Sequence, residues 1–299
     1  MEVIFLGTSE ATPTAEKNQS AVLLIHNGEQ ILFDCGENTQ RQFKIAKLNP
    51  CKITRILITH WHGDHILGLP GLLQTLALNN YSKTLKIYGP KGTKNFMGKI
   101  LGMFMFVESI KTEVHEIDEN GPFLETETFT IAAYKMKHMA PCLAYSFVEN
   151  DKRKINLAYI KKQGLKPGPL LGELQLGKDV RFKNKIIKAK QATQIRKGKK
   201  ISFMLDTSVN ENCVKVAKDA NLLISEATFL EKEHADKAKE RGHLTAKQAA
   251  TIAKKAKVKK LILTHISQRY AKNNQVILQE AKKTFKNSEL AKDFMKIIL

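Results

Sequence analysis

Short apolar runs separated by turn residues make up the first third of the chain. Residues 21–25 and 30–33 are two such runs, and the Asn27-Gly28 dipeptide between them is the strongest short-range signal for a β-hairpin. Residues 53–59 form a β-branched and almost wholly apolar run, which is typical of a strand buried on both faces. This pattern predicts a sheet in the N-terminal part of the chain.

Helices are expected between and after these strands. Apolar residues recur at helical spacing in residues 66–78, and residues 93–106 form a Met/Phe-rich segment that we also predict to be a helix. Strands and helices then alternate in the last third, with Thr245 as the N-cap of a helix over 245–256. Two strand-rich halves that carry helices indicate two packed sheets with helices outside, an α/β (α+β) fold with four-layer αββα architecture.

The alternation breaks down between residues 150 and 177. Residues 164–170, Gly-Leu-Lys-Pro-Gly-Pro-Leu, are not expected to form regular structure because they contain two glycines and two prolines. We therefore expect a single domain over residues 1–299, with an inserted arm over residues 150–177. Residues 178–200 follow this arm and are rich in lysine and arginine, with Asp179 as their acidic residue.

The chain is strongly basic. Its 49 lysine and arginine residues against 29 acidic residues give a formal charge of +20, which favours binding to polyanions such as nucleic acid, although a basic solvated surface is the simpler alternative. The four cysteines are widely spaced and form no CxxC pair, which fits a reducing cytoplasm better than a disulfide framework. No apolar stretch is long enough to cross a membrane. We expect a cytoplasmic protein that does not bind a membrane.

Three histidines and an aspartate occur within six residues in the segment His60-Trp61-His62-Gly63-Asp64-His65. Imidazole nitrogens and carboxylate oxygens are zinc ligands, and a catalytic zinc site keeps one position for water. Four ligands on one tight turn cannot easily surround a single ion. Dividing them as His60 with His62 and Asp64 with His65, over two neighbouring ions, is geometrically easier and requires further ligands from elsewhere.

Suitable ligands stand at the ends of three predicted strands. His138 follows the strand at 128–137, Asp206 follows the strand at 201–205, and His265 follows the strand at 260–264. Functional sites gather at the carboxyl ends of strands in α/β folds. Each of these residues alone would more often be structural, but together with the histidine-rich segment they form a consistent ligand set.

This arrangement resembles the metallo-β-lactamase superfamily, in which an HxHxDH segment follows a buried strand. The resemblance implies an αββα sandwich that binds two zinc ions (Zn²⁺) per subunit at one edge. By resemblance, one ion would be held by His60, His62 and His138, and the other by Asp64, His65 and His265. Asp206 would bridge the two ions.

Other segments are similar to the ribonuclease Z family. They are the opening residues 1–18, the glycine-proline segment at 164–169, Glu226-Ala227-Thr228 and His243-Leu244-Thr245. The resemblance extends to about Tyr270.

This chain also departs from the pattern of that family. Ser225 and Leu244 replace a histidine and a serine in two of its loops, and the loop at 13–18 has alanine and lysine where that family has lysine and arginine. These changes bear on how the 3′ end of the substrate is discriminated more than on the reaction.

The resemblance implies a zinc-dependent endoribonuclease that cleaves the 3′ trailer from precursor tRNA and leaves a 3′-hydroxyl on the tRNA. Asp64 would orient the attacking water, and His243, held and kept charged by Glu226, would protonate the leaving 3′ oxygen. The resemblance also implies a homodimer in which the arm of one subunit serves the active site of the other. The expected tRNA-binding residues of the arm are Lys152, Arg153, Lys154, Lys161, Lys162 and Lys166.

Three other functions could use a similar set of metal ligands. A hydrolase of the same superfamily that acts on a small phosphodiester, thioester or lactam would not require the high basic charge or the arm. An RNA-degrading relative would need room for a second domain between Asp206 and His265. A non-catalytic zinc-stabilised RNA-binding protein would need a closed four-ligand site. The ligand types do not decide between zinc, manganese and iron.

Overall fold

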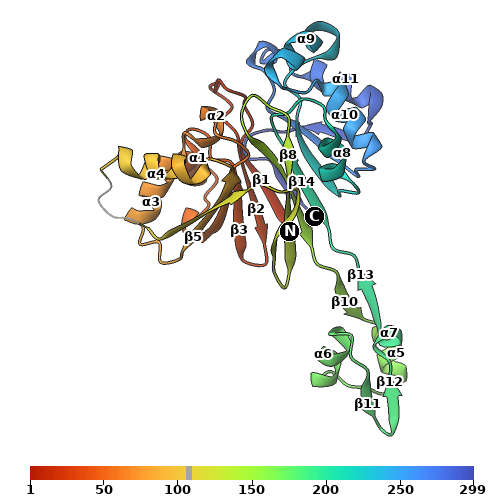
Figure 1. Ribbon diagram of the computed structural model, residues 1–299. Coiled ribbons are helices and arrows are strands. Elements are labelled where there is room, and N and C mark those ends of the chain that lie inside the picture. The colour runs from red at the N-terminus through yellow and green to blue at the C-terminus, as the bar shows by residue number, and fades with distance from the viewer. Residues whose placement is uncertain (106–109) are drawn as a thin grey trace. The chain divides into compact units, whose positions relative to one another are not determined.

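The structure is a computed structural model that describes residues 1–105 and 110–299 (Figure 1). The chain divides into two compact units. The main unit contains residues 1–125, 131–147 and 200–299, and the inserted unit contains residues 126–130 and 148–199. The helix expected at 93–106 is α4 (Thr93–Met103), and Phe106 lies outside the described residues.

The first large sheet is mixed and contains the N-terminal strands. Its β1, β2 and β3 pair antiparallel, with the predicted Asn27-Gly28 turn joining β2 to β3, whereas β3, β4, β5 and β6 pair in parallel. In spatial order the strands are β18 (Lys296–Ile298), β1 (Glu2–Gly7), β2 (Ala21–His26), β3 (Glu29–Phe33), β4 (Ile53–Leu57), β5 (Leu85–Pro90) and β6 (Thr112–Ile117).

The second large sheet contains three parallel pairings, of β14 with β15, β15 with β16 and β16 with β17. Parallel strands present their carboxyl ends at one edge, which is where a site can be assembled from several strands. In spatial order the strands are β17 (Ser288–Leu290), β16 (Leu261–Thr264), β15 (Leu222–Glu226), β14 (Lys200–Met204), β9 (Cys142–Glu149), β8 (Phe129–Met136) and β7 (Gly121–Glu125).

Helices cover one face of each sheet, so the predicted αββα arrangement of the main unit is confirmed (Figure 1). The first sheet packs against α1 (Thr39–Ile45), α3 (Leu69–Leu78) and α4. The second sheet packs against α8 (Glu211–Ala217), α10 (Ala246–Lys255) and α11 (Gln275–Thr284). The remaining helices of the main unit are η1 (Pro50–Lys52), α2 (Gly63–Ile66), α9 (Glu231–Arg241) and η2 (Gln268–Tyr270).

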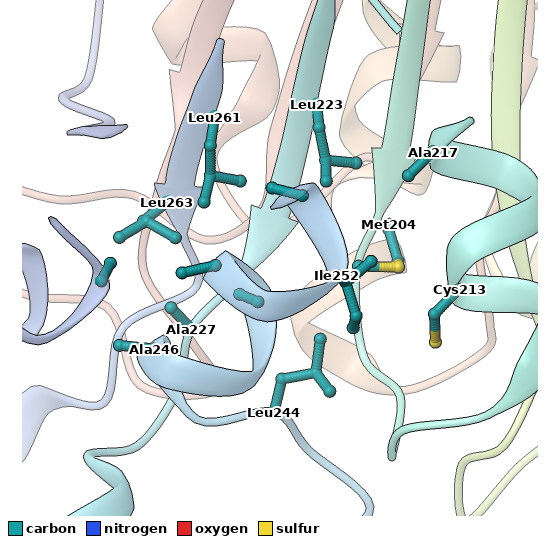
Figure 2. Packing of buried hydrophobic residues seen from close by; sticks show 14 of the residues in the cluster. Met204, Cys213, Ala217, Leu223, Ala227, Leu244, Ala246, Ile252, Leu261 and Leu263 are labelled. Atoms are coloured by element: carbon teal, nitrogen blue, oxygen red, sulfur yellow. The ribbon is translucent and has the colours of Figure 1, made fainter. Parts of the chain in front are cut away.

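Small and branched side chains fill the layer between α10 and the second sheet. Ala246 and Ile252 of α10 belong to one buried cluster with Leu223, Leu261 and Leu263 of the strands, which Figure 2 shows. Thr245 caps this helix as predicted, because its side chain accepts a hydrogen bond from the backbone N–H of Gln248. The alanines allow the helix to approach the sheet closely, which places the loop before Thr245 near the ends of the strands.

Aromatic side chains join the two sheets. The rings of Phe33 and Phe203 are stacked with centroids 3.5 Å apart, and both side chains are almost completely buried. Tyr145 is also fully buried, and its hydroxyl donates a hydrogen bond of 2.7 Å to the backbone oxygen of Ile58. This contact links the second sheet to the segment that leads from β4 into the histidine cluster.

The last strands of the chain were not expected from the sequence. In the structure, β18 pairs antiparallel with β1 and completes the first sheet, and β17 pairs in parallel with β16 and extends the second. Each has three residues, too few to show the alternation from which a strand is predicted.

The inserted unit has a core of its own, formed by seven buried apolar residues between Ile160 and Ala192. It extends past the expected arm at 150–177 to Lys199, because β10 (Lys152–Ile155) pairs with β13 (Thr193–Arg196). Its other elements are α5 (Leu157–Lys162), α6 (Pro169–Gln175), β11 (Val180–Phe182), β12 (Lys185–Ile187) and α7 (Ala189–Ala192).

The expectation that residues 164–170 lack regular structure is wrong at its end. Pro169 and Leu170 already belong to α6, and Pro169 is its first residue. A proline is well tolerated there because its fixed φ suits a helix and the missing N–H would have no partner in that turn.

Within the described part of the chain, no helix has the length and apolar character needed to span a membrane.

Candidate metal centre and active site

The histidine cluster begins three residues after β4 ends and continues into the short helix α2. His60 and His65 are completely buried, whereas Asp64 retains 9% of its exposure. His60 and His62 of this turn lie with His138, whereas Asp64 and His65 lie with His265. The structure thus separates His60 and His62 from Asp64 and His65, as the spacing predicts.

Three imidazole nitrogens of the first group lie within contact distance of one another. His62 Nδ1 is 3.0 Å from His60 Nε2 and 3.2 Å from His138 Nε2. In a tetrahedral zinc site, nitrogens at about 2.05 Å from the metal are about 3.3 Å apart. The three nitrogens therefore have the spacing of neighbouring ligands on one metal ion.

The second group contains Asp64 and His65 of α2 and His265, which follows β16. Asp64 Oδ2 lies 3.2 Å from His65 Nε2 and 3.2 Å from His265 Nε2. The ligand atoms of this group, with those of Asp206, all lie within 4.8 Å of one another. This spacing also suits a single ion, and all four side chains are buried.

Asp206 lies between the two groups and offers one oxygen to each. Its Oδ2 is 3.6 Å from His60 Nε2 and 3.8 Å from His138 Nε2, whereas its Oδ1 is 3.3 Å from His265 Nε2. Two buried atoms here, Asp206 Oδ1 and His65 Nε2, make no hydrogen bond in the described structure. A buried polar atom without a partner is costly, and a metal ion would satisfy both atoms. The residues therefore fit a pair of metal ions.

The ionisation of the site also suits metal binding. Burial would raise the pKa of Asp206, but the imidazoles of His265 and His65 outweigh it and hold this pKa well below the usual range. For His60, burial and the neighbouring His65 lower the pKa well below its ordinary value, so its imidazole is neutral and free to bind a metal. Burial lowers the pKa of His65, but the nearby carboxylates of Asp206 and Asp64 raise it overall. Such an excess of buried negative charge favours a cation at this position.

Hydrogen bonds on the far side of the rings fix which nitrogen faces the centre. Asp34 is fully buried, and its Oδ2 lies 2.7 Å from His65 Nδ1 and accepts a hydrogen bond of 2.8 Å from the Thr59 hydroxyl. His65 Nδ1 must therefore carry the proton, which leaves Nε2 free for a metal. Asp34 has a left-handed backbone conformation, with φ of 56°.

His138 is oriented by the backbone. Its Nδ1 donates a hydrogen bond of 2.9 Å to the carbonyl oxygen of Gly242, so Nε2 again faces the other ligands. Gly242 ends α9 with φ of 72°, and a Cβ atom at this position would lie 2.9 Å from His138 Nδ1. Only glycine meets both conditions without strain.

His265 is oriented by Thr228. The Thr228 hydroxyl lies 2.6 Å from Glu226 Oε2, to which it donates, and 3.2 Å from His265 Nδ1, from which it accepts. This assignment leaves His265 Nε2 free for a metal. One hydroxyl therefore joins a metal-ligand candidate to the carboxylate that the sequence singled out for catalysis.

Glu226 and His243 form a pair beside the metal centre. Glu226 is fully buried at the end of β15, and its Oε1 accepts from the Thr207 backbone N–H at 2.7 Å and from His243 Nδ1 at 3.2 Å. Burial lowers the pKa of His243, but Glu226 and Asp206 outweigh it and raise the pKa to about 9. The protonated ring is therefore favoured at neutral pH, with Nε2 left to act as a proton donor.

All nine metal and catalytic candidates from the sequence thus lie in one part of the main unit. The residues that sequence reasoning missed are the partners behind them: Asp34, Thr59, Thr228 and Gly242. Asp34 directly follows the apolar run at 30–33, and nothing in this short segment shows that its carboxylate will meet a histidine 31 positions later.

The candidate tRNA-binding residues all lie in the inserted unit. Lys152 and Lys154 are exposed on β10, although Lys152 forms an ion pair of 3.1 Å with Glu149. Arg153 is partly buried and donates to Thr193 Oγ1 at 3.2 Å, so it stabilises the unit. The remaining three are exposed, at the end of α5 and in the loop after it: Lys161, Lys162 and Lys166.

The sequence of this chain is similar to those of known proteins. Residues 1–156 match the family described as Anti-Pycsar protein Apyc1. Over 298 residues the chain is 42% identical to the ribonuclease Z of Methanothermobacter thermautotrophicus. The matched region covers 99% of this chain and 96% of that relative.

Two solved structures are similar along almost their whole length. The short form of human tRNase Z is 34% identical with a TM-score of 0.71, over 100% of this chain and 99% of that one. The metallo-β-lactamase fold protein YhfI from Bacillus subtilis has a TM-score of 0.70 at 21% identity, over 99% of this chain and 98% of that one, which supports the fold alone. The chain therefore belongs to the ribonuclease Z family and has the metallo-β-lactamase fold.

Proposed function

We propose that this protein is a metal-dependent endoribonuclease that cleaves the 3′ trailer from precursor tRNA and leaves a 3′-hydroxyl on the tRNA. The observation on which this rests is the Glu226–His243 pair beside the two ligand groups, in a chain similar to ribonuclease Z over 99% of its length. A hydrolase of small esters needs the metal ligands but has no need of a separate proton donor, such as His243, held beside them.

Two zinc ions are the proposed cofactor, held by the two groups and shared through Asp206. Bound there, they would supply an activated water as nucleophile and offset negative charge on the phosphoryl oxygens. Asp64 is ionised, because the imidazoles of His65 and His265 hold its pKa well below the usual range in spite of burial. One oxygen of Asp64 faces those rings, and its carboxylate is placed to orient the attacking water.

His243 is the proposed proton donor to the leaving 3′ oxygen. Its ring keeps 14% of its exposure while its partner Glu226 is inaccessible, so a substrate can reach the imidazole but not the carboxylate. Glu226 favours the charged imidazole, and the Thr207 N–H and the Thr228 hydroxyl hold Glu226 in place. These contacts keep the donor aligned before the substrate binds.

The inserted unit is proposed to bind the tRNA. Its exposed lysines would contact phosphates, which makes the affinity depend steeply on salt. We also propose a homodimer in which the inserted unit of one subunit serves the other. A reducing cytoplasm is the proposed compartment, and the four cysteines are free thiols.

The test compares two substrates at matched enzyme concentration, a precursor tRNA with a 3′ trailer and bis(p-nitrophenyl) phosphate. We expect kcat/KM to favour the precursor tRNA strongly, and His243→Ala to abolish that preference while the zinc content remains unchanged. An enzyme that hydrolyses the small diester efficiently but leaves the tRNA intact would support the alternative, a hydrolase of small phosphodiesters or thioesters.

The role of the inserted unit is tested separately. Lys161→Gln combined with Lys162→Gln should raise KM for the precursor tRNA and leave hydrolysis of the small diester unchanged. Lys254→Gln combined with Lys255→Gln is the matched control, since it removes two exposed charges from α10 of the main unit. Equal effects of the two double variants would show that the inserted unit has no special part in binding.

A further inference from the structure

Arg269 is an exposed cation that is held in a fixed position near the active site. It lies in η2, four residues after His265. Its Nε donates a hydrogen bond of 3.0 Å to the hydroxyl of Ser267, which in turn donates to Glu10 Oε1 at 3.1 Å. Glu10 Oε1 also accepts from the backbone N–H of Gln268 at 3.0 Å. The Glu10 carboxylate thus holds the Ser267 hydroxyl, which in turn holds the arginine Nε.

The flat face of the guanidinium is fixed as well. Arg269 Cζ lies 5.1 Å from the centre of the Phe229 ring, in a cation–π contact. Phe229 is almost completely buried, and its ring centre is 6.0 Å from that of His243. Phe229 therefore lies close to both the arginine and the proposed proton donor.

The remaining donors of Arg269 have no partner in the described part of the chain. Nε is its hydrogen-bonded nitrogen, and no carboxylate among the described residues forms an ion pair with the guanidinium. A fixed arginine presents two terminal nitrogens as a planar fork, the geometry that binds two oxygens of a phosphate at once. An unpaired cation held in this way is already oriented for an anionic ligand.

We infer that Arg269 binds a backbone phosphate of the RNA substrate, adjacent to the phosphate that is cleaved. This inference rests on the proposed function and adds to it a residue that positions the substrate. A phosphate one nucleotide from the cut is favoured over the scissile phosphate itself, because the guanidinium packs on the Phe229 ring, whereas the His243 imidazole is held by Glu226. The contact would align the strand so that the leaving oxygen meets the His243 imidazole.

The test uses Arg269→Gln, which removes the charge, and Arg269→Lys, which keeps the charge but not the fork. Lys272→Gln is the matched control, because Lys272 is an exposed cation three residues further along. For Arg269→Gln we expect kcat/KM on the precursor tRNA to fall about tenfold or more, the size of a lost hydrogen bond to a charged group. The slope of log affinity against log salt should fall by about one.

Arg269→Lys should restore the salt slope but only part of the rate. Lys272→Gln should match the wild-type enzyme, and all three variants should hydrolyse bis(p-nitrophenyl) phosphate at the wild-type rate with unchanged zinc content, because that diester has no neighbouring phosphate. Equal losses on both substrates, or no loss on the tRNA, would overturn the inference. A wild-type enzyme that fails to cleave the precursor tRNA would instead refute the proposed function, so the two failures are distinguishable.

Discussion

The Thr228 hydroxyl offers the sharpest test of how the metal centre and the proton donor are connected. Thr228→Val keeps the size and the β-branched shape of the side chain and removes only the hydroxyl. Glu226 then loses a donor at 2.6 Å, and His265 Nδ1 loses its acceptor at 3.2 Å. Both groups are buried, so water cannot replace the lost partner.

The expected size follows from these two contacts. A hydrogen bond to a charged group contributes about 1.5–3 kcal/mol, which corresponds to roughly a 10- to 150-fold fall in kcat if the Glu226–His243 alignment is lost. Loss of the hydrogen bond behind a metal-binding histidine lowers metal affinity by about 10- to 100-fold. We therefore expect Thr228→Val to lower both kcat and zinc affinity, with little change in KM for tRNA.

The assay is a steady-state measurement on precursor tRNA at saturating zinc, together with a zinc titration against a competing chelator. Thr228→Ser is the control, because it keeps the hydroxyl and should retain most of the rate and the affinity. The reasoning is refuted if Thr228→Val keeps the wild-type kcat and zinc affinity, or if Thr228→Ser is as defective as Thr228→Val.

Three further outcomes follow from the structure. Asp34→Asn should weaken zinc binding by about 10- to 100-fold, measured by chelator competition, since one Asp34 oxygen accepts from the Thr59 backbone N–H and the other from the Thr59 hydroxyl and His65, so the NH2 group of an amide would face a donor; unchanged affinity would contradict the role given to Asp34. Phe33→Ala should lower the free energy of unfolding in urea by about 3–5 kcal/mol, because the ring is buried against Phe203, whereas Phe96→Ala should cost far less since Phe96 is 40% exposed; similar losses would argue against this packing. Zinc at a hundredfold excess over its Kd should stabilise the metal-free protein by about 2.7 kcal/mol for each of the two sites in a thermal unfolding series, and a variant with His60→Ala and His65→Ala should show no such gain.

The metal ligands could be predicted from the sequence because each is a chemically distinctive residue at a strand end or within a dense cluster. His138, Asp206 and His265 are far apart in the chain, yet each follows an apolar run that predicts a strand. The parallel pairing of β14, β15 and β16 then brings Asp206 and His265 to one edge, and the bridge between Lys137 and Ser208 brings His138 to the same place. The family resemblance drawn from these segments is confirmed by relatives that are similar over nearly the full length.

The contacts of the partners behind the ligands could not be predicted: Thr228 lies in a segment that carries the family resemblance, but nothing in the local sequence shows which side chain it will meet. Thr228 meets His265 across 37 positions, and Gly242 meets His138 across 104, so both contacts depend on the finished packing of the strands and loops. The same reason hides β18, whose three residues are a strand only because β1 offers an unpaired edge.

Mapping the ends of the products from a precursor tRNA with a 3′ trailer tests the central claim most directly. We predict a single internal cut at the tRNA 3′ end, a 3′-hydroxyl on the tRNA, loss of cleavage with a chelator and recovery when zinc is restored. A ladder of shortened trailers, a 3′-phosphate on the tRNA, or cleavage that persists in the chelated enzyme would contradict it.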